Sequence, residues 1–169
     1  MPIQAVLQGA GLISGIVRID LLESGRSANC RIVLRALDGS YAQCESDQFL
    51  FNLTSFLPEK KQIVLNHVDC VCQDGSIRHT CWSLEKDVET SFGHFDYRLI
   101  CSHDEGGAPL KEGEDLLFQL LAADAHDGFT EESFLDAPAS TFNGFQAALV
   151  IKFPGSKRML AGGQFEVKP

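Results

Sequence analysis

Cysteine and histidine side chains concentrate in the segment from residue 67 to residue 82. This segment holds three of the six cysteines and two of the five histidines, which are His67, Cys70, Cys72, His79 and Cys81. Thiolate and imidazole are ligands that zinc prefers, and neighbouring thiols support redox chemistry. Asp74-Gly75 in the middle is a turn signal. The segment is therefore either a metal or redox site, or a plain β-hairpin in which cysteine serves as a small apolar residue.

The expected hairpin register limits the metal hypothesis. If Asp74-Gly75 forms a two-residue type I′ turn, Cys70 lies opposite His79. Cys72 and Cys81 then flank this pair on opposite sides, about 13 Å apart along the ribbon. Zinc–sulfur bonds near 2.3 Å require ligand atoms within about 4 Å of one another, so these four residues cannot meet. The register leaves Cys70 and His79 as a candidate zinc pair that needs further ligands, and it favours the plain hairpin.

The opposite face of the same hairpin offers candidates for recognition. In this register Trp82 lies opposite His67, on the face that does not carry the thiols. Trp82 has an amphipathic ring, a type of side chain that is enriched at binding surfaces. We therefore predict that Trp82 and His67 bind a ligand or partner. The alternative is that both faces of the sheet are covered and Trp82 belongs to a second core.

Glycines near the N-terminus resemble the start of a dinucleotide-binding domain. Gly9-Ala-Gly11 follows a strand-like run, and an acidic residue, Asp38, comes further along the chain. That resemblance implies a phosphate-binding turn and a nucleotide-dependent enzyme. The β-branched residues of 13–19, however, favour a strand over a helix. Residues 40–110 show no crossover helices, so the favoured interpretation is a glycine-rich turn between antiparallel strands.

Alternation of apolar and polar residues with period two dominates the rest of the chain. It is clearest over 30–36, 95–101 and 145–153. We expect about eight or nine short antiparallel strands, closed into a β-sandwich or barrel, in a single domain of residues 1–169.

Residues 112–126 break this period. Apolar pairs at helical spacing, Leu116/Leu120 and Leu117/Leu121, predict an amphipathic helix there. Acidic residues precede the apolar run, as is favourable at a helix start. Thr130 predicts a second, short helical turn over 131–136.

Charge excludes several partners. The formal net charge is −9, and no cluster of lysine or arginine exceeds a pair. Nucleic acids and anionic membrane surfaces require several basic contacts, so neither is expected as a partner. The N-terminus lacks the pattern of a signal peptide, and no apolar run approaches the ~20 residues of a membrane-spanning helix. We therefore expect a cytoplasmic protein with reduced, mostly buried thiols.

No motif for catalysis emerges from the sequence. The serine in Gly11-Leu-Ile-Ser14-Gly15 is displaced by one position from the nucleophile elbow. We predict a non-enzymatic, acidic binding or assembly module without a cofactor, whose partner is a protein or a small ligand. The sequence also allows the chain to associate with itself as a homo-oligomer. The alternatives are a zinc-binding protein that uses Cys70 and His79, and a nucleotide-dependent enzyme that uses Gly9 and Gly11.

Overall fold

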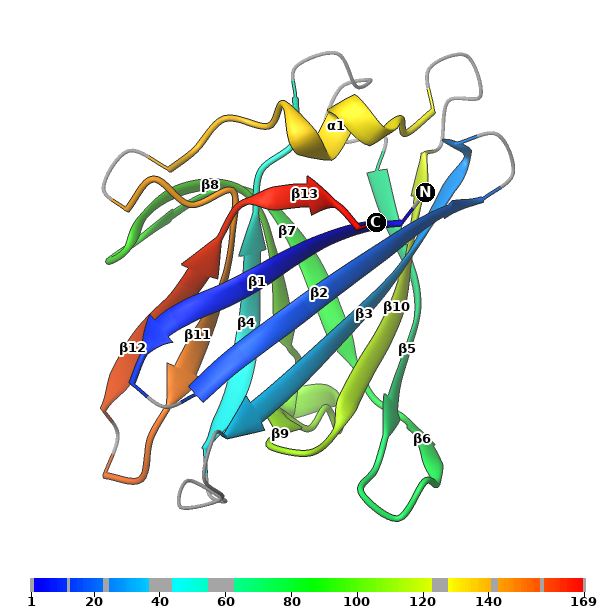
Figure 1. The fold of residues 1–169 in the computed structure, drawn as a ribbon. Helices are drawn as coiled ribbons and strands as arrows, with labels where there is room; N and C mark the ends of the chain where they lie inside the picture. The colour runs from blue at the N-terminus through cyan, green and yellow to red at the C-terminus, as the bar shows by residue number, and fades with distance from the viewer. Residues whose placement is uncertain are drawn as a thin grey trace.

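The computed structural model describes residues 2–11, 13–22, 25–36, 44–54, 63–122, 128–140, 143–155 and 157–168. These residues form thirteen strands, a short α-helix and a 3-10 turn (Figure 1). The elements are β1 (Ile3–Ala10), β2 (Ile13–Leu22), β3 (Ser27–Ala36), β4 (Glu45–Phe51), β5 (Ile63–Val71), β6 (Ile77–His79), β7 (Trp82–Thr90), β8 (Gly93–Cys101), η3 (His103–Glu105), β9 (Leu110–Lys111), β10 (Asp115–Ala122), α1 (Glu131–Leu135), β11 (Ala147–Lys152), β12 (Arg158–Gly163) and β13 (Phe165–Val167).

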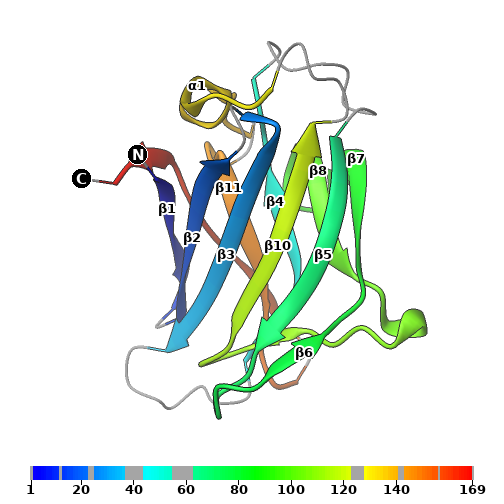
Figure 2. The same ribbon diagram turned by 90° about the vertical axis from the view of Figure 1, so that its right-hand side faces the viewer.

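The strands form one antiparallel sheet that curls into a half-barrel. Its order is β6-β5-β10-β3-β2-β1-β12-β11-β4-β8-β7, while β13 pairs with β1 and β9 pairs with β4. Figures 1 and 2 show β5, β10, β3, β2 and β1 on one side of the molecule, with β4, β8 and β7 behind them. We call β6-β5-β10-β3-β2-β1 the front wall and β12-β11-β4-β8-β7 the back wall. The prediction of a mainly antiparallel β fold is confirmed.

The strand number differs from the prediction, because thirteen strands replace the expected eight or nine. Strands β6, β9 and β13 contain only two or three residues each. A run that short carries no period-two pattern, so only its pairing with a neighbour identifies it. The pairings also join all the strands in one curled sheet, and two separate sheets of a sandwich are not seen among the described residues.

The main core lies between the two walls. Strand β8 shows how alternation fills it, since Tyr97, Leu99 and Cys101, at every second position, are buried in this core. Rings from opposite walls meet there, with 6.2 Å between the ring centroids of Phe49 in β4 and Phe118 in β10. A Cβ at Gly15 in β2 would come within 2.6 Å of Leu149 Cδ1 in β11. The walls are therefore packed closely enough to exclude a side chain at that point.

A second apolar cluster covers the outer face of the back wall. Leu50, Phe95, Ala148 and Val150 are buried there and pack against Phe92, Phe145 and Leu160. As a result, β11 is buried continuously from Ala147 to Ile151. Hydrogen bonds hold the covering segment in place, because the side-chain amide of Asn143 donates to the Phe92 carbonyl at 2.7 Å. Strands β11 and β4 are thus buried on both faces over these residues, whereas β7 has exposed residues.

The helix predicted over 112–126 is not found in residues 112–122, which the structure describes. Asp115–Ala122 is strand β10, which lies between β3 and β5 (Figure 2). Leu116, Phe118 and Leu120 face the core, while Leu117 and Gln119 lie on the outer face. A dense apolar run satisfies helical and strand periods at once, and backbone pairing on both sides decided between them. Residues 123–127 lie outside the described residues.

The short helical turn predicted after Thr130 is confirmed as α1, whose start is fixed by a hydrogen bond of 2.9 Å from the Thr130 N–H to Ser133 Oγ. No helix in the described segments has the length and apolar character needed to cross a membrane.

The glycine motif near the N-terminus lies in an antiparallel hairpin. Strand β1 pairs with β2 through Leu7 with Gly15 and Ala10 with Ile13. Gly9 lies within β1 at a shift in register, and Gly11 follows the end of this strand. Both glycines have positive φ, +109° and +65°. A dinucleotide-binding unit needs parallel strands joined by a crossover helix. The nucleotide hypothesis for Gly9 and Gly11 therefore loses its structural basis, and the glycine-rich turn is confirmed.

Candidate functional site

The β5–β6 hairpin exists, but its register differs by one residue from the prediction. Asp69 pairs with His79, and Cys70 pairs with Arg78. The N–H of Cys72 donates to the Ser76 carbonyl at 2.8 Å, so the loop contains three residues instead of two. Gly75 in this loop has a φ of +85°, which a glycine adopts without strain. A three-residue loop that ends in a left-handed glycine is a common alternative to the type I′ turn.

This shift separates the two residues of the predicted zinc pair. Cys70 points into the protein and is 1% exposed, whereas 70% of the His79 side chain is exposed. His79 lies beside Asp69, with 3.4 Å between Nδ1 and Oδ1. The predicted opposition of Cys70 and His79 is therefore wrong, because a one-residue slip moves each side chain to the other face of a strand.

Trp82 does not lie on an exposed face. It begins β7 in the back wall and is 8% exposed, and its indole N–H donates to the Ala108 carbonyl at 3.2 Å. The chain leaves the front wall at Thr80, whose N–H donates to the Val68 carbonyl at 3.1 Å. Trp82 therefore pairs with Cys101 of β8 and not with the β5 strand. The prediction of an exposed ring at Trp82 is wrong, and Trp82 is buried in the main core instead of the second core that was the stated alternative.

His67 is exposed on β5 and marks a β-bulge. Strand β10 pairs Phe118 with Val68 but Gln119 with Asn66, so His67 is the extra residue. Its φ is +50°, in the left-handed region that favours glycine. Such a conformation costs a non-glycine residue about 1–2 kcal/mol. Bulges re-aim side chains and are over-represented beside functional sites, and strained backbone likewise clusters there.

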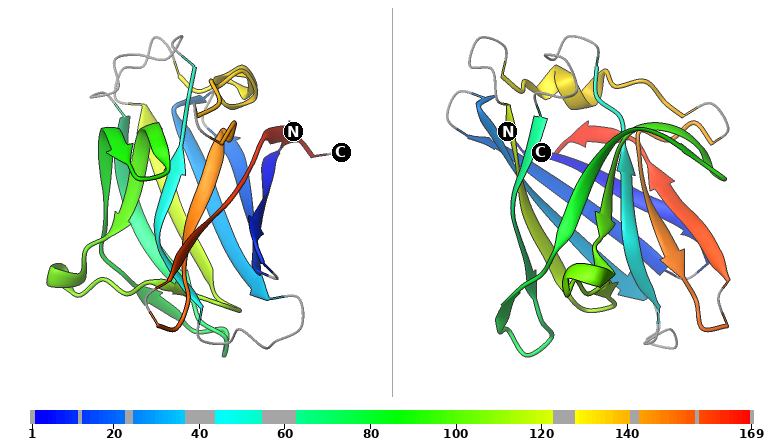
Figure 3. Two further views of the ribbon diagram at one scale, coloured as in Figure 1. Left: turned by 90° about the vertical axis from the view of Figure 1, so that its left-hand side faces the viewer. Right: turned by 180° about the vertical axis from the view of Figure 1, so that it is seen from behind.

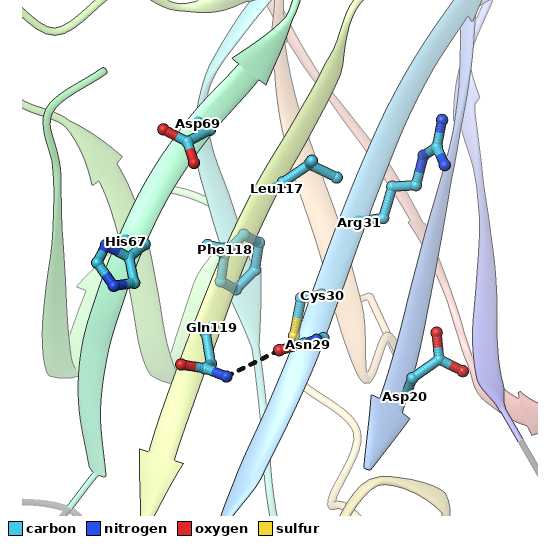
Figure 4. A pocket seen from close by; sticks show the side chains of 9 residues that line it. All are labelled: Asp20, Asn29, Cys30, Arg31, His67, Asp69, Leu117, Phe118 and Gln119. Atoms are coloured by element: carbon cyan, nitrogen blue, oxygen red, sulfur yellow. Dashed lines mark hydrogen bonds between the residues drawn. The ribbon is translucent and has the colours of Figure 1, made fainter. Parts of the chain in front are cut away.

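His67 borders a hollow of about 370 Å³ on the outer face of the front wall. Figure 4 shows the side chains around it, which come from β2, β3, β10 and β5. The lining residues are Asp20, Asn29, Cys30, Arg31, His67, Asp69, Leu117, Phe118 and Gln119. Among these residues, only His67 was predicted from the sequence to bind a ligand or partner. The polar residues of this face sit at alternate positions of four strands, and no sequence motif joins them.

A row of amide side chains from β5, β10 and β3 reaches the hollow. The Gln119 amide donates to Asn29 Oδ1 at 3.0 Å within it (Figure 4). The Asn66 amide, beside the lining, donates to Gln119 Oε1 at 2.9 Å. We call Asn66, Gln119 and Asn29 the amide ladder. Each amide has two N–H donors and an oxygen with two lone pairs, so the ladder uses only part of their capacity. The mutual hydrogen bonds fix the amides in orientation and leave further groups for a ligand.

The charged side chains that line the hollow include two aspartates and one arginine, so their net charge is slightly negative. Asp69 and Asp20 lie at opposite ends of it in Figure 4. Arg31 is paired with Asp115, because its Nε donates a hydrogen bond to Asp115 Oδ2 at 2.8 Å. Asp115 is buried and also lies 3.5 Å from Arg35, which keeps this carboxylate paired. Asp20 lies 3.7 Å from Arg18 Nε, and Asp69 lies 3.4 Å from His79 Nδ1, so each aspartate at the hollow has a partner on one side.

The floor of the hollow holds a thiol that is poorly suited to catalysis. Cys30 is buried, and its S–H contacts the Ala28 carbonyl at 3.7 Å. Burial, reinforced by Asp20, raises the pKa of the Cys30 thiol far above its ordinary range. A thiol is nucleophilic only as the thiolate. Cys30 thus behaves as an apolar residue of the core.

Two groups in the described residues bring metal-ligating atoms within 4.8 Å of one another. One, at the β7–β8 turn, comprises Asp87, His94 and Asp96; His94 also lies 2.9 Å from Glu89, so its ring is already engaged. The other comprises Cys70, Cys72 and Glu114 at the β5–β6 hairpin. Burial first, and then the Glu114 carboxylate, raises the pKa of the Cys70 thiol to about 12, while Arg78 opposes this shift.

Comparison with known proteins gives weak similarities in structure alone. No family model matches the sequence, and no curated protein is significantly similar to it. A family 3a carbohydrate-binding module from the cipA scaffolding of Clostridium thermocellum is 13% identical, with a TM-score of 0.39 over 95% of this chain and 98% of that one. The CBM3a-L domain with flanking linkers from scaffoldin cipA of the same organism's cellulosome is 14% identical, with a TM-score of 0.43 over 93% and 92% of the two chains. At these values neither similarity says what this chain binds.

Proposed function

We propose that this chain is a non-enzymatic module that binds a small, neutral, hydroxyl-bearing ligand in the hollow on the outer face of the front wall. The observation that carries the proposal is the bulge at His67, whose left-handed backbone lies beside the amide ladder. An ordinary outer face of a sheet needs no strained residue. Strain of this kind is retained where it positions a functional side chain.

The chemistry of the lining favours hydroxyl groups. A hydroxyl donates one hydrogen bond and accepts others, so it matches a surface that offers both amide donors and carboxylate acceptors. The amide ladder supplies donors in the middle, and Asp20 and Asp69 supply acceptors at the two ends (Figure 4). The same carboxylates, in a chain of net charge −9, repel anionic ligands.

The distance between the two aspartates sets the size of the ligand. Asp69 is in β5 and Asp20 in β2, with β10 and β3 between them. Three inter-strand spacings of about 4.8 Å place these strands about 14 Å apart. A ligand that engages both carboxylates is therefore an extended molecule. A smaller one engages the amide ladder and one aspartate.

The lining does not supply the groups that catalysis needs. Acyl or group transfer requires a nucleophile within hydrogen-bonding reach of a base. The described lining contains no serine or threonine, and its one thiol, Cys30, is buried and protonated. This supports binding without turnover.

The test is a nuclear magnetic resonance titration of the ¹⁵N-labelled chain with hydroxyl-bearing probes. Glucose, cellobiose, glycerol and inositol are the probes, with phosphate as an anionic comparison and ethanolamine as a cationic one. At least one neutral probe is expected to shift the side-chain amides of Asn29 and Gln119 with a Kd of about 1 mM or below, which corresponds to about −4 kcal/mol. The Gln119→Leu variant should lose this binding.

Gln8→Leu is the matched control, because Gln8 is also an exposed strand glutamine but lies on β1, outside the hollow. This variant should bind like the natural chain. If only ethanolamine or only phosphate shifts the amide resonances, or if both glutamine variants bind equally, the proposal is wrong.

A further inference from the structure

The Cys70, Cys72 and Glu114 side chains converge at one end of the front wall. The β5–β6 hairpin projects from the molecule at that end (Figure 2). Cys70 is in β5, and Cys72 follows the last residue of that strand. The two residues are at i and i+2, so they point to the same side. Strand β10 pairs Asp115 with Val71, which places Glu114 opposite Cys72. The convergence therefore follows from one strand and the register of its neighbour.

We infer that Cys70, Cys72 and Glu114 form a zinc site with one coordination position open to solvent. Three protein ligands plus a water molecule is a common arrangement for an open zinc site, and two thiolates with a carboxylate is a ligand set that zinc accepts. Soft thiolates also select against magnesium and calcium. This site is separate from the hollow and from the ligand proposed for it.

Distances in the cluster are close to those of a loaded site. The three ligand atoms lie within 4.8 Å of one another. Tetrahedral zinc with bonds near 2.3 Å places its sulfur ligands about 3.8 Å apart. Side-chain rotations that move each sulfur by less than about 1 Å close this gap. Cys72 is only half-buried, which gives an ion a route to the cluster.

The surrounding residues hold the ligands in position. The Lys111 N–H donates to Glu114 Oε1 at 3.0 Å, which orients this buried carboxylate. The hairpin loop is tied to the same turn, because the Gln73 side-chain amide donates to the Glu112 carbonyl at 2.7 Å. Supporting hydrogen bonds of this kind orient ligands and raise metal affinity.

Arg78 places a positive charge beside the cluster. It pairs with Cys70 across the hairpin, and its Nη2 forms an ion pair of 3.8 Å with Glu114 Oε1. Nε and Nη2 are buried and make no hydrogen bond to the described residues. Buried donors are normally satisfied, so both groups have capacity left for further acceptors. Thiolates of a metal-bound cluster would be such acceptors.

Charge balance favours a divalent ion. Two thiolates and one carboxylate carry three negative charges, so bound Zn²⁺ leaves one, and the Arg78 guanidinium neutralises it. Binding releases the thiol protons to solvent, which is the usual cost of loading a thiolate site. A trivalent ion or a second cation would leave positive charge in a buried environment.

The test is a titration of the fully reduced chain with Co²⁺, followed by competition with Zn²⁺. Co²⁺ in a tetrahedral thiolate site gives charge-transfer bands in the near ultraviolet and visible bands that Zn²⁺ removes. One equivalent of Co²⁺ should bind. Cys72→Ser should lose the charge-transfer intensity of one thiolate and weaken binding by at least about 100-fold, and the near-isosteric Glu114→Gln should weaken it while keeping both thiolates.

Cys81→Ser is the matched control, since Cys81 is also half-buried but lies outside the cluster. Its spectrum should equal that of the natural chain. Arg78→Met should lower the affinity by about 10- to 100-fold without changing the number of thiolates.

Three results would overturn the zinc site. The first is the absence of a charge-transfer band from the natural chain and from every variant, and the second is equal spectra for the Cys72→Ser and natural chains. The third is a Cys70–Cys72 disulfide that forms in air and consumes both thiols, while no metal binds to the reduced form.

Discussion

The outer faces of the two walls differ although the same sheet forms both. On the back wall, Phe92 and Phe145 pack against Leu50, Phe95, Ala148 and Val150, so this part of the wall has a second core. On the front wall, the corresponding face carries amides, carboxylates and a hollow. The right-hand view of Figure 3 shows the back wall, and Figure 2 shows the front wall.

This difference separates stability from recognition. A face covered by apolar side chains contributes to folding through the surface it removes from water. A face with fixed polar groups and one strained residue removes less apolar surface from water, and we proposed above that its polar groups bind a ligand. The hollow lies on the outer face of the front wall, and the proposed zinc cluster lies at the end of this wall with Cys70 pointing inward. The following substitutions test whether the back wall contributes mainly to stability and the front wall mainly to binding.

The largest effect is expected from Phe95→Ala in the back wall. Phe95 is fully buried in the second cluster, and removal of a buried phenylalanine side chain costs about 3–5 kcal/mol. Leu117→Ala on the outer face of the front wall should cost less than about 1.5 kcal/mol, because Leu117 is only partly buried. Urea denaturation measures both. Equal losses would contradict the contrast between the walls.

Thiol reactivity should distinguish buried from accessible cysteines. Burial, with Asp47 and Glu45 as further causes, raises the pKa of Cys101 in β8 from 9.0 to about 11. Because a raised pKa lowers the thiolate fraction at pH 8, alkylation of Cys101 should be about 100-fold slower in the folded than in the unfolded chain. The rate should rise with pH until about 11.

Peptide mapping by mass spectrometry after iodoacetamide treatment measures these rates. Cys72, which is half-buried on the front wall, should react first in the metal-free protein. Cys101 reacting as fast as Cys72 at pH 8 would show that the back wall opens readily in solution.

Gly162→Ala should disturb the covering of the back wall. A Cβ at Gly162 would come within 2.2 Å of the Phe145 ring, which must then move. Overpacking of this kind costs about 1–3 kcal/mol. In a Phe145→Leu background the same change should cost less, and this double-mutant cycle isolates the contact. Additive losses would mean that the ring is not what the new methyl group meets.

The smallest effect on stability is expected from His67→Gly. Glycine adopts φ of +50° without strain, so this variant should be more stable by about 0.5–1 kcal/mol. It should nevertheless bind the probe more weakly, because the ring at the hollow is lost. Asp87→Gly is the control: Asp87 also has positive φ, +52°, but lies on β7, outside the hollow. That variant should keep its binding, and weaker binding there would argue against a role specific to His67.

The two walls also differ in how well their strands can be predicted from the sequence alone. Strands with one polar and one apolar face, such as β8, follow from the period alone. Strand β10 does not, because Leu116, Leu117, Leu120 and Leu121 fit a helix equally well. Hydrogen bonds to β3 and β5 on either side decide for the strand, and these partners are far away in the sequence.

The candidate site was predictable only in part. His67 was identified, but its neighbours in the hollow come from four strands and share no local motif. Cys70 was identified as a ligand, but with His79 as its partner. Register depends on the turn that the chain adopts at Asp74-Gly75, and a loop longer by one residue exchanged His79 for Arg78 opposite Cys70.

The sequence by itself determined an antiparallel β fold, a hairpin around Asp74-Gly75 and the concentration of thiols near it. These follow from local patterns, which act between neighbours in the chain. The tertiary structure alone decided that Trp82 is buried, that Glu114 joins Cys70 and Cys72, and that one wall of the sheet stays open to solvent. Each of these depends on which distant strand lies alongside and on which side chains cover it, and pairing and coverage between distant segments are set only when the whole chain packs.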